Sequence, residues 1–194
     1  GTIQVRQAQP QEKLVLLNDQ EVELQDDIMV IADQQKVLAI AGIMGGLDSS
    51  VTDDTQDIFL ESAFFAPLAI AGRARRFGLH TDSSQRYERG VDFELPMIAM
   101  HRASELIQAF AGGEFGPITV AEQAELLPKR EAIPLKQSQV DQLLGYEVAG
   151  EFIADALARL GCMVETKAQG EWSVVPPSHR YDMAIYQDLI EEVA

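Results

Sequence analysis

Four carboxylates near the end of the chain have a spacing that could bind a metal. Asp188, Glu191 and Glu192 stand at positions i, i+3 and i+4, which places their side chains on one side of a helix, and Asp182 lies just before it. Carboxylate oxygens are ligands that Mg²⁺ and Ca²⁺ prefer. Because helix polarity does not favour anions toward the chain's end, we expect a compensating partner. The spacing indicates either a divalent-cation site or a solvated acidic helix end.

A second group of candidate residues combines a carboxylate with a glycine cluster. Glu61 follows an apolar segment and precedes Ala63-Phe64-Phe65, so we expect it beside a buried wall. There it can accept a hydrogen bond from a substrate hydroxyl or amine, or pair with a nearby arginine. The glycine cluster, residues 42–46, lacks the spacing and the Lys-Ser/Thr ending of a phosphate loop. It indicates either a tight turn after a strand or a pocket wall that a ligand approaches closely.

Residues 80–83 contain side-chain types of a hydrolytic triad. They read His-Thr-Asp-Ser, but they are sequence neighbours and no nucleophile elbow accompanies them. A serine triad needs groups that converge from separate elements. The sequence therefore argues against one.

Short strands and helices that end at glycines must position these residues. Alternating apolar residues predict strands near Ile3 and Val5 and over residues 14–17, 28–32, 37–40 and 57–60. Helical periodicity then predicts helices, each followed by glycine. These helices cover residues 68–77, 85–89 and 95–110.

A second part of the chain begins after residues 121–134, where acidic residues and prolines break the pattern. Ser138, with Asp141 three residues later, resembles a capping box for a short helix that Gly145 ends. Another helix is predicted over 152–160, followed by a hairpin with a glycine-containing loop. Two helices followed by a hairpin predict a small winged-helix-like module.

The composition restricts the class of protein. The 194 residues include 15 Lys and Arg against 31 Asp and Glu, which gives a net charge of −16. That balance argues against broad neutralisation of nucleic-acid phosphates and against an anionic membrane surface as partner. One cysteine and three histidines exclude a disulfide framework and a Cys/His zinc cluster. With no membrane-length apolar run and no signal peptide, we expect a soluble, cytoplasmic globular protein.

Three segments together resemble one family closely. The first runs from the Gly-Ile-Met-Gly-Gly of the glycine cluster to the Leu-Glu-Ser-Ala-Phe-Phe around Glu61, and the second is residues 72–92, which include Gly-Leu-His-Thr-Asp-Ser-Ser. The third joins the Pro-Ser-His-Arg-Tyr-Asp-Met of residues 177–183 to the acidic residues 188–194. The chain resembles, nearly end to end, an internal piece of the beta subunits of bacterial phenylalanyl-tRNA synthetases.

The resemblance implies an editing site. In that family this region holds most of the domain that hydrolyses tyrosine wrongly attached to the phenylalanine tRNA. Glu61 would recognise the tyrosine hydroxyl, and the other residues would line the pocket and position the ester and a water; no catalytic residue is assigned. Position 83 is often alanine in the family, so serine is a mild departure. The implied editing-pocket residues are Gly42, Gly45, Glu61, Thr81 and Ser83.

The resemblance also implies cofactors and partners. The family attaches phenylalanine to its tRNA with ATP and Mg²⁺; the whole enzyme uses the ATP, and this region does not bind it. Its enzyme is a heterotetramer of two alpha and two beta subunits, its nucleic-acid partner is tRNA(Phe), and we expect no membrane or DNA partner. The Mg²⁺ is shared with the alpha subunit, which also carries the aminoacylation site. The implied metal ligands are Asp182, Asp188, Glu191 and Glu192.

Two further expectations depend on the family. It carries a His-Ala-Phe-Asp segment just upstream of the position of Gly1, and its histidine belongs to the editing site. We therefore expect the 194-residue chain by itself to lack synthetase activity, and its editing to depend on that segment. A cluster of arginines either approaches the tRNA end or forms ion pairs with Glu61, Asp82, Glu88 and Asp92, which we favour. These arginines are Arg73, Arg75, Arg76, Arg86 and Arg89.

The expected fold class is α+β. A mixed, β-rich portion of the editing domain, which would also bind tRNA, is expected over residues 1–125. A small winged-helix-like α/β domain with the acidic metal-binding helix is expected over residues 126–194. The alternative function is a non-catalytic RNA-binding or subunit-interface scaffold of the synthetase, which needs no tyrosyl pocket.

Overall fold

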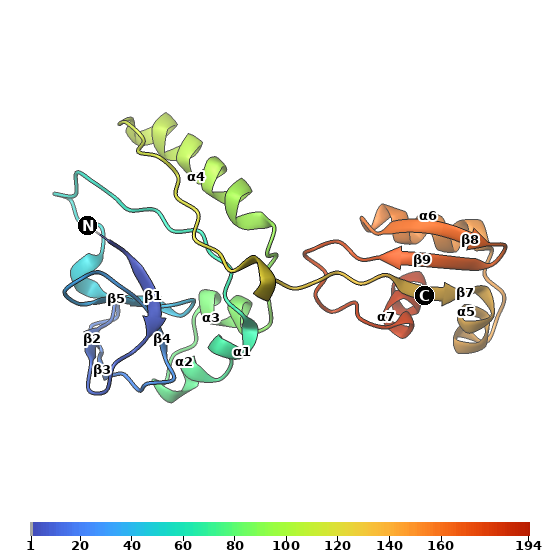
Figure 1. The fold of residues 1–194 in the computed structure, drawn as a ribbon, viewed down its shortest axis with the longest axis horizontal. Coiled ribbons are helices and arrows are strands. Elements are labelled where there is room, and N and C mark those ends of the chain that lie inside the picture. The colour runs from blue at the N-terminus through green and yellow to red at the C-terminus, as the bar shows by residue number, and fades with distance from the viewer. Residues whose placement is uncertain (1) are drawn as a thin grey trace. The chain divides into compact units, whose positions relative to one another are not determined.

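The first half of the chain folds around two small antiparallel sheets (Figure 1). The computed structural model describes residues 2–194, which form two compact units: residues up to 91 with 96–103, and residues 92–95 with 104–194. In the first unit, a four-stranded sheet has the order β1-β4-β5-β6 and a hairpin pairs β2 with β3. The strands are β1 (Gln4–Gln7), β2 (Lys13–Val15), β3 (Glu21–Glu23), β4 (Met29–Ala32), β5 (Val37–Ile40) and β6 (Met44–Gly45).

Alternation decides which side of these strands is buried. Leu14 and Val22 face each other across the β2–β3 hairpin and are buried, while their neighbours in both strands are exposed. A side-chain period of two requires this arrangement. The core continues through fully buried side chains between and after the strands, including Leu16, Leu24 and Ile28. The predicted strands before residue 41 are therefore confirmed, with ends shifted by a residue or two.

Three short helices follow the sheets: α1 (Pro67–Ile70), α2 (Arg73–Arg76) and α3 (Asp82–Tyr87). The single helix predicted over 68–77 is wrong, because Gly72 adopts a left-handed conformation with φ of +76° that interrupts it. Ile70, Ala74 and Leu79 pack into the same core as the strands. The helical segment is thus anchored to the sheets by its apolar residues.

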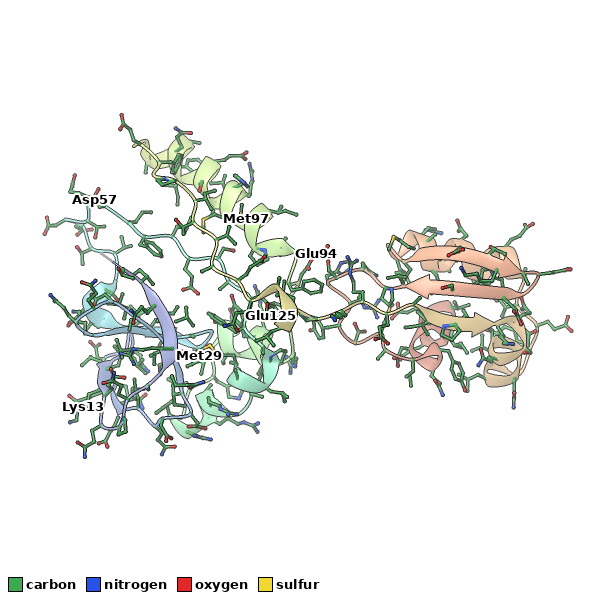
Figure 2. The ribbon with its side chains drawn as sticks, in the orientation of Figure 1. Lys13, Met29, Asp57, Glu94, Met97 and Glu125 are labelled. Carbon is green, nitrogen blue, oxygen red and sulfur yellow. The ribbon has the colours of Figure 1, made fainter. Side chains whose placement is uncertain are left out.

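The connection from the sheets to α1 has no regular structure. After the short 3₁₀ helix η1 (Leu47–Ser49), residues 51–66 contain no helix or strand, and Asp57 lies on this segment (Figure 2). The strand predicted over 57–60 is therefore wrong; Ile58 and Phe59 are 53% and 75% exposed. A strand needs a neighbour for its backbone N–H and C=O groups, and none of the strands in residues 2–194 pairs with this segment.

The long helix predicted over 95–110 is confirmed as α4 (Leu95–Ala111), which ends at Gly112 with φ of +73°. None of its residues is buried in the described part of the chain. Met97, labelled in Figure 2, is 41% exposed. The apolar face from which this helix was predicted therefore belongs to neither hydrophobic core among the described residues.

The second unit contains a three-stranded antiparallel sheet of order β7-β9-β8 together with three helices. The predicted order of two helices followed by a hairpin is confirmed. The capping box predicted at Ser138 is wrong: the N-cap is Lys136, α5 begins at Gln137, and the Gln139 side chain accepts the Lys136 N–H at 2.9 Å. The elements are η2 (Ala124–Leu126), β7 (Ile133–Lys136), α5 (Gln137–Leu144), α6 (Gly150–Arg159), β8 (Met163–Ala168), β9 (Glu171–Val175) and α7 (Tyr186–Val193).

A second hydrophobic core holds this unit together. Leu135 on β7, Leu157 on α6 and Leu189 on α7 are fully buried and belong to one cluster that Trp172 of β9 joins. Separate antiparallel sheets and helices confirm the expected α+β class. In the part of the chain that the structure describes, no helix combines the length and the apolar character needed to cross a membrane.

Candidate functional site

The predicted pocket residues line one cavity of about 470 Å³ in the first unit. Gly42, Gly45, Glu61, Thr81 and Ser83 all contribute to its wall, although they come from three separate stretches of sequence. The rest of the wall is mostly apolar and comes from the strands and their turns. These other lining residues are Leu17, Ile31, Ala39, Ile40, Ile43, Met44 and Tyr87.

The glycine cluster is both a tight turn and a pocket wall, so the two interpretations of it are compatible. Gly42 has φ of +66°, and a Cβ there would lie 3.1 Å from the Tyr87 ring. A Cβ at Gly46 would lie 2.7 Å from the Leu38 carbonyl oxygen, which is closer than real contacts allow. Glycine is therefore required at 42 by conformation and at 46 by space.

Two hydroxyls join the first turn of α3 to this glycine turn. The Thr81 hydroxyl donates to the Ile43 carbonyl at 2.8 Å and accepts the Ser84 N–H at 2.9 Å, so it also caps the helix. The Ser83 hydroxyl donates to the Gly42 carbonyl at 3.0 Å. Both hydroxyl protons are thus bonded within the protein. Thr81 and Ser83 position the wall of the cavity and are not arranged as nucleophiles.

Glu61 brings a carboxylate without a protein partner to the cavity. Within residues 2–194 its carboxylate makes no hydrogen bond and no ion pair, so the expected pairing with an arginine is wrong. Glu61 as a whole residue is exposed to solvent. The atoms packed around its carboxyl group nevertheless desolvate that group, which raises its pKa above the ordinary glutamate value, because desolvation disfavours the charged form. The carboxylate is free to accept a hydrogen bond from a ligand in the cavity.

Tyr87, which no sequence pattern had identified as functional, holds the irregular segment that carries Glu61 against α3. Its hydroxyl donates to the Ala63 carbonyl at 3.0 Å, and its ring lies 5.4 Å, centroid to centroid, from that of the buried Phe65. Burial, and secondarily the charge of Glu61, raise the pKa of the Tyr87 hydroxyl. The signal was its position four residues after Ser83, which places both on one helix face.

The arginines pair with a different carboxylate from those expected. Arg76 donates to Asp27 at 2.6 Å, and the Arg73 Nε lies 3.5 Å from the same carboxylate. The expected partners Glu61, Asp82, Glu88 and Asp92 are therefore wrong for these two. Asp27 lies in the turn before β4, a position that periodicity does not connect to α2. The remaining arginines, Arg75, Arg86 and Arg89, are exposed.

The four carboxylates of the second unit, here called the acidic group, are Asp182, Asp188, Glu191 and Glu192. Asp188 lies in the first turn of α7 and accepts the N–H groups of Ala184 and Ile185 at 2.8 and 2.9 Å. The expectation that helix polarity opposes it is wrong, because α7 begins only at Tyr186 and its N-terminus favours an anion.

Arg180 supplies positive charge to two other members of the acidic group. It donates to Asp182 at 2.6 Å and also to Glu192, and these hydrogen bonds hold the pKa of both carboxyls below their ordinary values. Glu191 is exposed. Among residues 2–194, no group of three or more His, Cys, Asp or Glu side chains is arranged to hold a metal ion. In this conformation the acidic group does not fit a metal site.

Comparisons with known proteins match the two parts of the chain to two domain families and the whole chain to one group of curated proteins. Residues 1–112 match the family model of the B3/4 domain, and residues 133–194 match that of the tRNA synthetase B5 domain. The whole chain is 81% identical to the phenylalanine–tRNA ligase beta subunit of Acinetobacter baylyi, 53% to that of Pseudomonas savastanoi pv. phaseolicola and 52% to that of Idiomarina loihiensis. It spans 24% of the length of each of these relatives.

The solved structures include an N-terminal fragment of the phenylalanyl-tRNA synthetase beta subunit from Pyrococcus horikoshii. The match covers 100% of this chain and 55% of that fragment, with 14% sequence identity and a TM-score of 0.45. That likeness is too distant to add to the sequence matches. The B3/4 model alone covers more than half of the chain, and the B5 model covers most of the remainder. The chain belongs to the B3/4 domain family, its residues 133–194 match the B5 model, and along its whole length it is similar to phenylalanine–tRNA ligase beta subunits.

Proposed function

We propose that the first unit is an editing domain that hydrolyses tyrosyl-tRNA(Phe) within a phenylalanine–tRNA ligase. The observation that carries this proposal is the Glu61 carboxylate, which has no protein partner and lines a largely apolar cavity. An apolar wall suits the aromatic ring of an amino acid, and one acceptor at that wall suits a phenol hydroxyl. Phenylalanine has the ring and lacks the hydroxyl.

Selectivity follows from the hydrogen bond that only tyrosine can make. A phenol O–H that donates to an ionised carboxylate forms a charge-assisted bond, which is stronger than a neutral one. Phenylalanine would displace water from Glu61 and leave the carboxylate without a donor. Sites that hydrogen-bond a substrate hydroxyl reject the analogue without it far better than apolar pockets reject an extra methylene.

The hydrolysis proposed here needs positioning more than a nucleophilic side chain. Thr81 and Ser83 donate their hydroxyl protons to backbone carbonyls, so neither is available to form a covalent intermediate. A water held near the ester by the pocket and by the substrate's own hydroxyl groups would attack the ester carbon directly. The role of this chain is to bind the tyrosyl ring in the orientation that brings the ester to that water.

The test is hydrolysis of tyrosyl-tRNA(Phe) by three proteins: the complete synthetase, the 194-residue chain, and that chain extended by its upstream segment. We expect the complete enzyme and the extended chain to release tyrosine faster than the 194-residue chain does. Phenylalanyl-tRNA(Phe) is the matched control and should be spared. Equal loss of both amino acids, or no hydrolysis even by the complete enzyme, would favour the non-catalytic scaffold instead.

The pH dependence of tyrosine release provides a separate prediction. Because burial raises the pKa of Glu61, its carboxylate is lost as the pH falls through a value above the ordinary glutamate pKa of about 4.3. We expect kcat/KM for tyrosyl-tRNA(Phe) to fall with decreasing pH around that raised pKa. Glu61→Gln should abolish this acid limb, and a limb that persists in the variant would assign the titration to another group.

The parent enzyme and its partners are also part of the proposal. Relatives named phenylalanine–tRNA ligase beta subunit support a parent that joins phenylalanine to tRNA. We propose in addition that this parent uses ATP and Mg²⁺, acts on tRNA(Phe) in the cytoplasm, and is a heterotetramer with two alpha subunits. We propose that the acidic group contributes to a Mg²⁺ site only in that assembly. We also propose a domain boundary near residue 125, which lies between the regions that match the B3/4 and B5 models.

A further inference from the structure

Two arginines at the end of α3 have no partner in the described part of the chain. Arg86 lies on α3, and Arg89 lies in the turn that follows it, where its backbone N–H donates to the Arg86 carbonyl at 3.2 Å. Both residues are exposed, and neither side chain makes an ion pair or a hydrogen bond within residues 2–194. The end of α3 therefore carries two positive charges that these residues do not neutralise.

Unpaired arginines are unexpected in a chain of this charge. Carboxylates outnumber Lys and Arg by 31 to 15, and elsewhere in the first unit a cation such as Arg6 pairs with Glu12 at 2.7 Å. Asp82 lies four residues before Arg86, a spacing at which opposite charges stabilise a helix. The two side chains nevertheless do not pair in the structure of residues 2–194. Arg86 and Arg89 are thus available to an anion from outside these residues.

The position of these arginines relates their charge to the proposed substrate. Ser83 and Tyr87 of α3 line the cavity, and Arg86 stands three residues after Ser83, a spacing that makes two side chains neighbours on a helix surface. An aminoacyl ester in the cavity is attached to the 3′ end of a tRNA, so the phosphates of the terminal nucleotides must lie close by. Arginine suits them, because its forked N–H donors match the oxygens of a phosphate.

We propose that Arg86 and Arg89 bind phosphates of the terminal nucleotides of the aminoacyl-tRNA and so hold its 3′ end at the cavity. Two local contacts are compatible with a net charge of −16, which argues only against a broad basic surface. On single-stranded RNA, each phosphate contact contributes about −0.7 to the slope of log affinity against log salt. This inference rests on the proposed editing function and names the part of the substrate that the end of α3 recognises.

The salt dependence of editing by the complete synthetase tests the proposal, with Arg86→Gln and Arg89→Gln combined in one variant. Between about 50 and about 200 mM salt, kcat/KM of the wild type for tyrosyl-tRNA(Phe) should fall about sevenfold more than that of the double variant, because two phosphate contacts are lost. The tyrosyl ester of adenosine has the ester and no phosphate, so the double substitution should affect its hydrolysis less than that of tyrosyl-tRNA(Phe). Replacing both arginines by lysine keeps the charges and should keep most of the slope.

Arg75→Gln is the matched control. Arg75 is also exposed and without an ion pair in residues 2–194, but it lies on α2, which contributes no residue to the cavity wall. A loss of slope in Arg75→Gln as large as that in either single variant, Arg86→Gln or Arg89→Gln, would indicate a general effect of charge and overturn the proposal.

Two further results would also overturn it. One is a double variant whose salt slope equals that of the wild type, including the case in which the synthetase then assembles less well, since the arginines would pair with carboxylates elsewhere in that enzyme. The other is an equal loss on both substrates, which would assign the arginines to the shape of the cavity. A wild type that hydrolyses no tyrosyl-tRNA(Phe) would refute the editing proposal and this inference together, whereas an active wild type with an unchanged slope in the variant refutes this inference alone.

Discussion

In the complete synthetase, Glu61→Ala is expected to let tyrosyl-tRNA(Phe) accumulate while phenylalanine charging proceeds at its normal rate. The variant removes the acceptor that has no protein partner in the cavity. The loss in tyrosine recognition should be about 2 kcal/mol, or about 30-fold in kcat/KM for editing, the scale of a hydrogen bond to a charged group. Deacylation of preformed tyrosyl-tRNA(Phe) measures it directly.

Glu61→Gln is the matched control, because it keeps the volume of the side chain and a neutral acceptor. Its editing defect should be smaller than that of Glu61→Ala. Since the pKa of Glu61 is raised in the folded protein, ionisation costs stability as the pH rises above the unfolded value. Glu61→Gln should therefore leave the first unit at least as stable at pH 7. Unchanged clearance of tyrosyl-tRNA(Phe) by both variants would remove Glu61 from tyrosine recognition.

The family resemblance, and not the pattern of the residues alone, indicated which five residues line the cavity; four of them lie in compact local motifs. Gly42 and Gly45 surround one strand end, and Thr81 and Ser83 share one helix turn, so each pair is near in space whatever the rest of the fold does. Glu61 is different. Its segment has no regular structure, and only the contacts of Tyr87 and Phe65 fix its place. Periodicity contains no information about such contacts.

The wrong predictions have physical causes of the same kind. The helix over 68–77 failed at Gly72, where a left-handed conformation outweighs helical periodicity. The pairing of Arg76 with Asp27 joins groups far apart in sequence, as does the bond from Arg180 to Glu192. Charge patterning identifies which groups need partners, but it does not choose among distant ones.

Thr81→Val is expected to lower both the stability of the first unit and its editing activity. The substitution keeps the shape of the side chain and removes the hydroxyl that donates to the Ile43 carbonyl and accepts the Ser84 N–H. Ser84 is buried, so its N–H would lose a partner that water does not readily replace. We expect a loss of about 2 kcal/mol from the lost cap and the unsatisfied groups. Hydrogen exchange of the α3 amides measures this local loss.

The editing defect of Thr81→Val should arise through geometry and not through a lost reacting group. Thr81 ties α3 to the glycine turn, and α3 in turn carries Tyr87, which holds the segment of Glu61. Thr81→Ser keeps both hydroxyl bonds and should retain most activity and protection. Glu61→Gln provides the contrast, since that variant should show an editing defect, smaller than that of Glu61→Ala, without losing stability. If Thr81→Val edits poorly while its α3 amides stay fully protected, Thr81 contacts the substrate or its water directly, and the positioning role assigned to it is wrong.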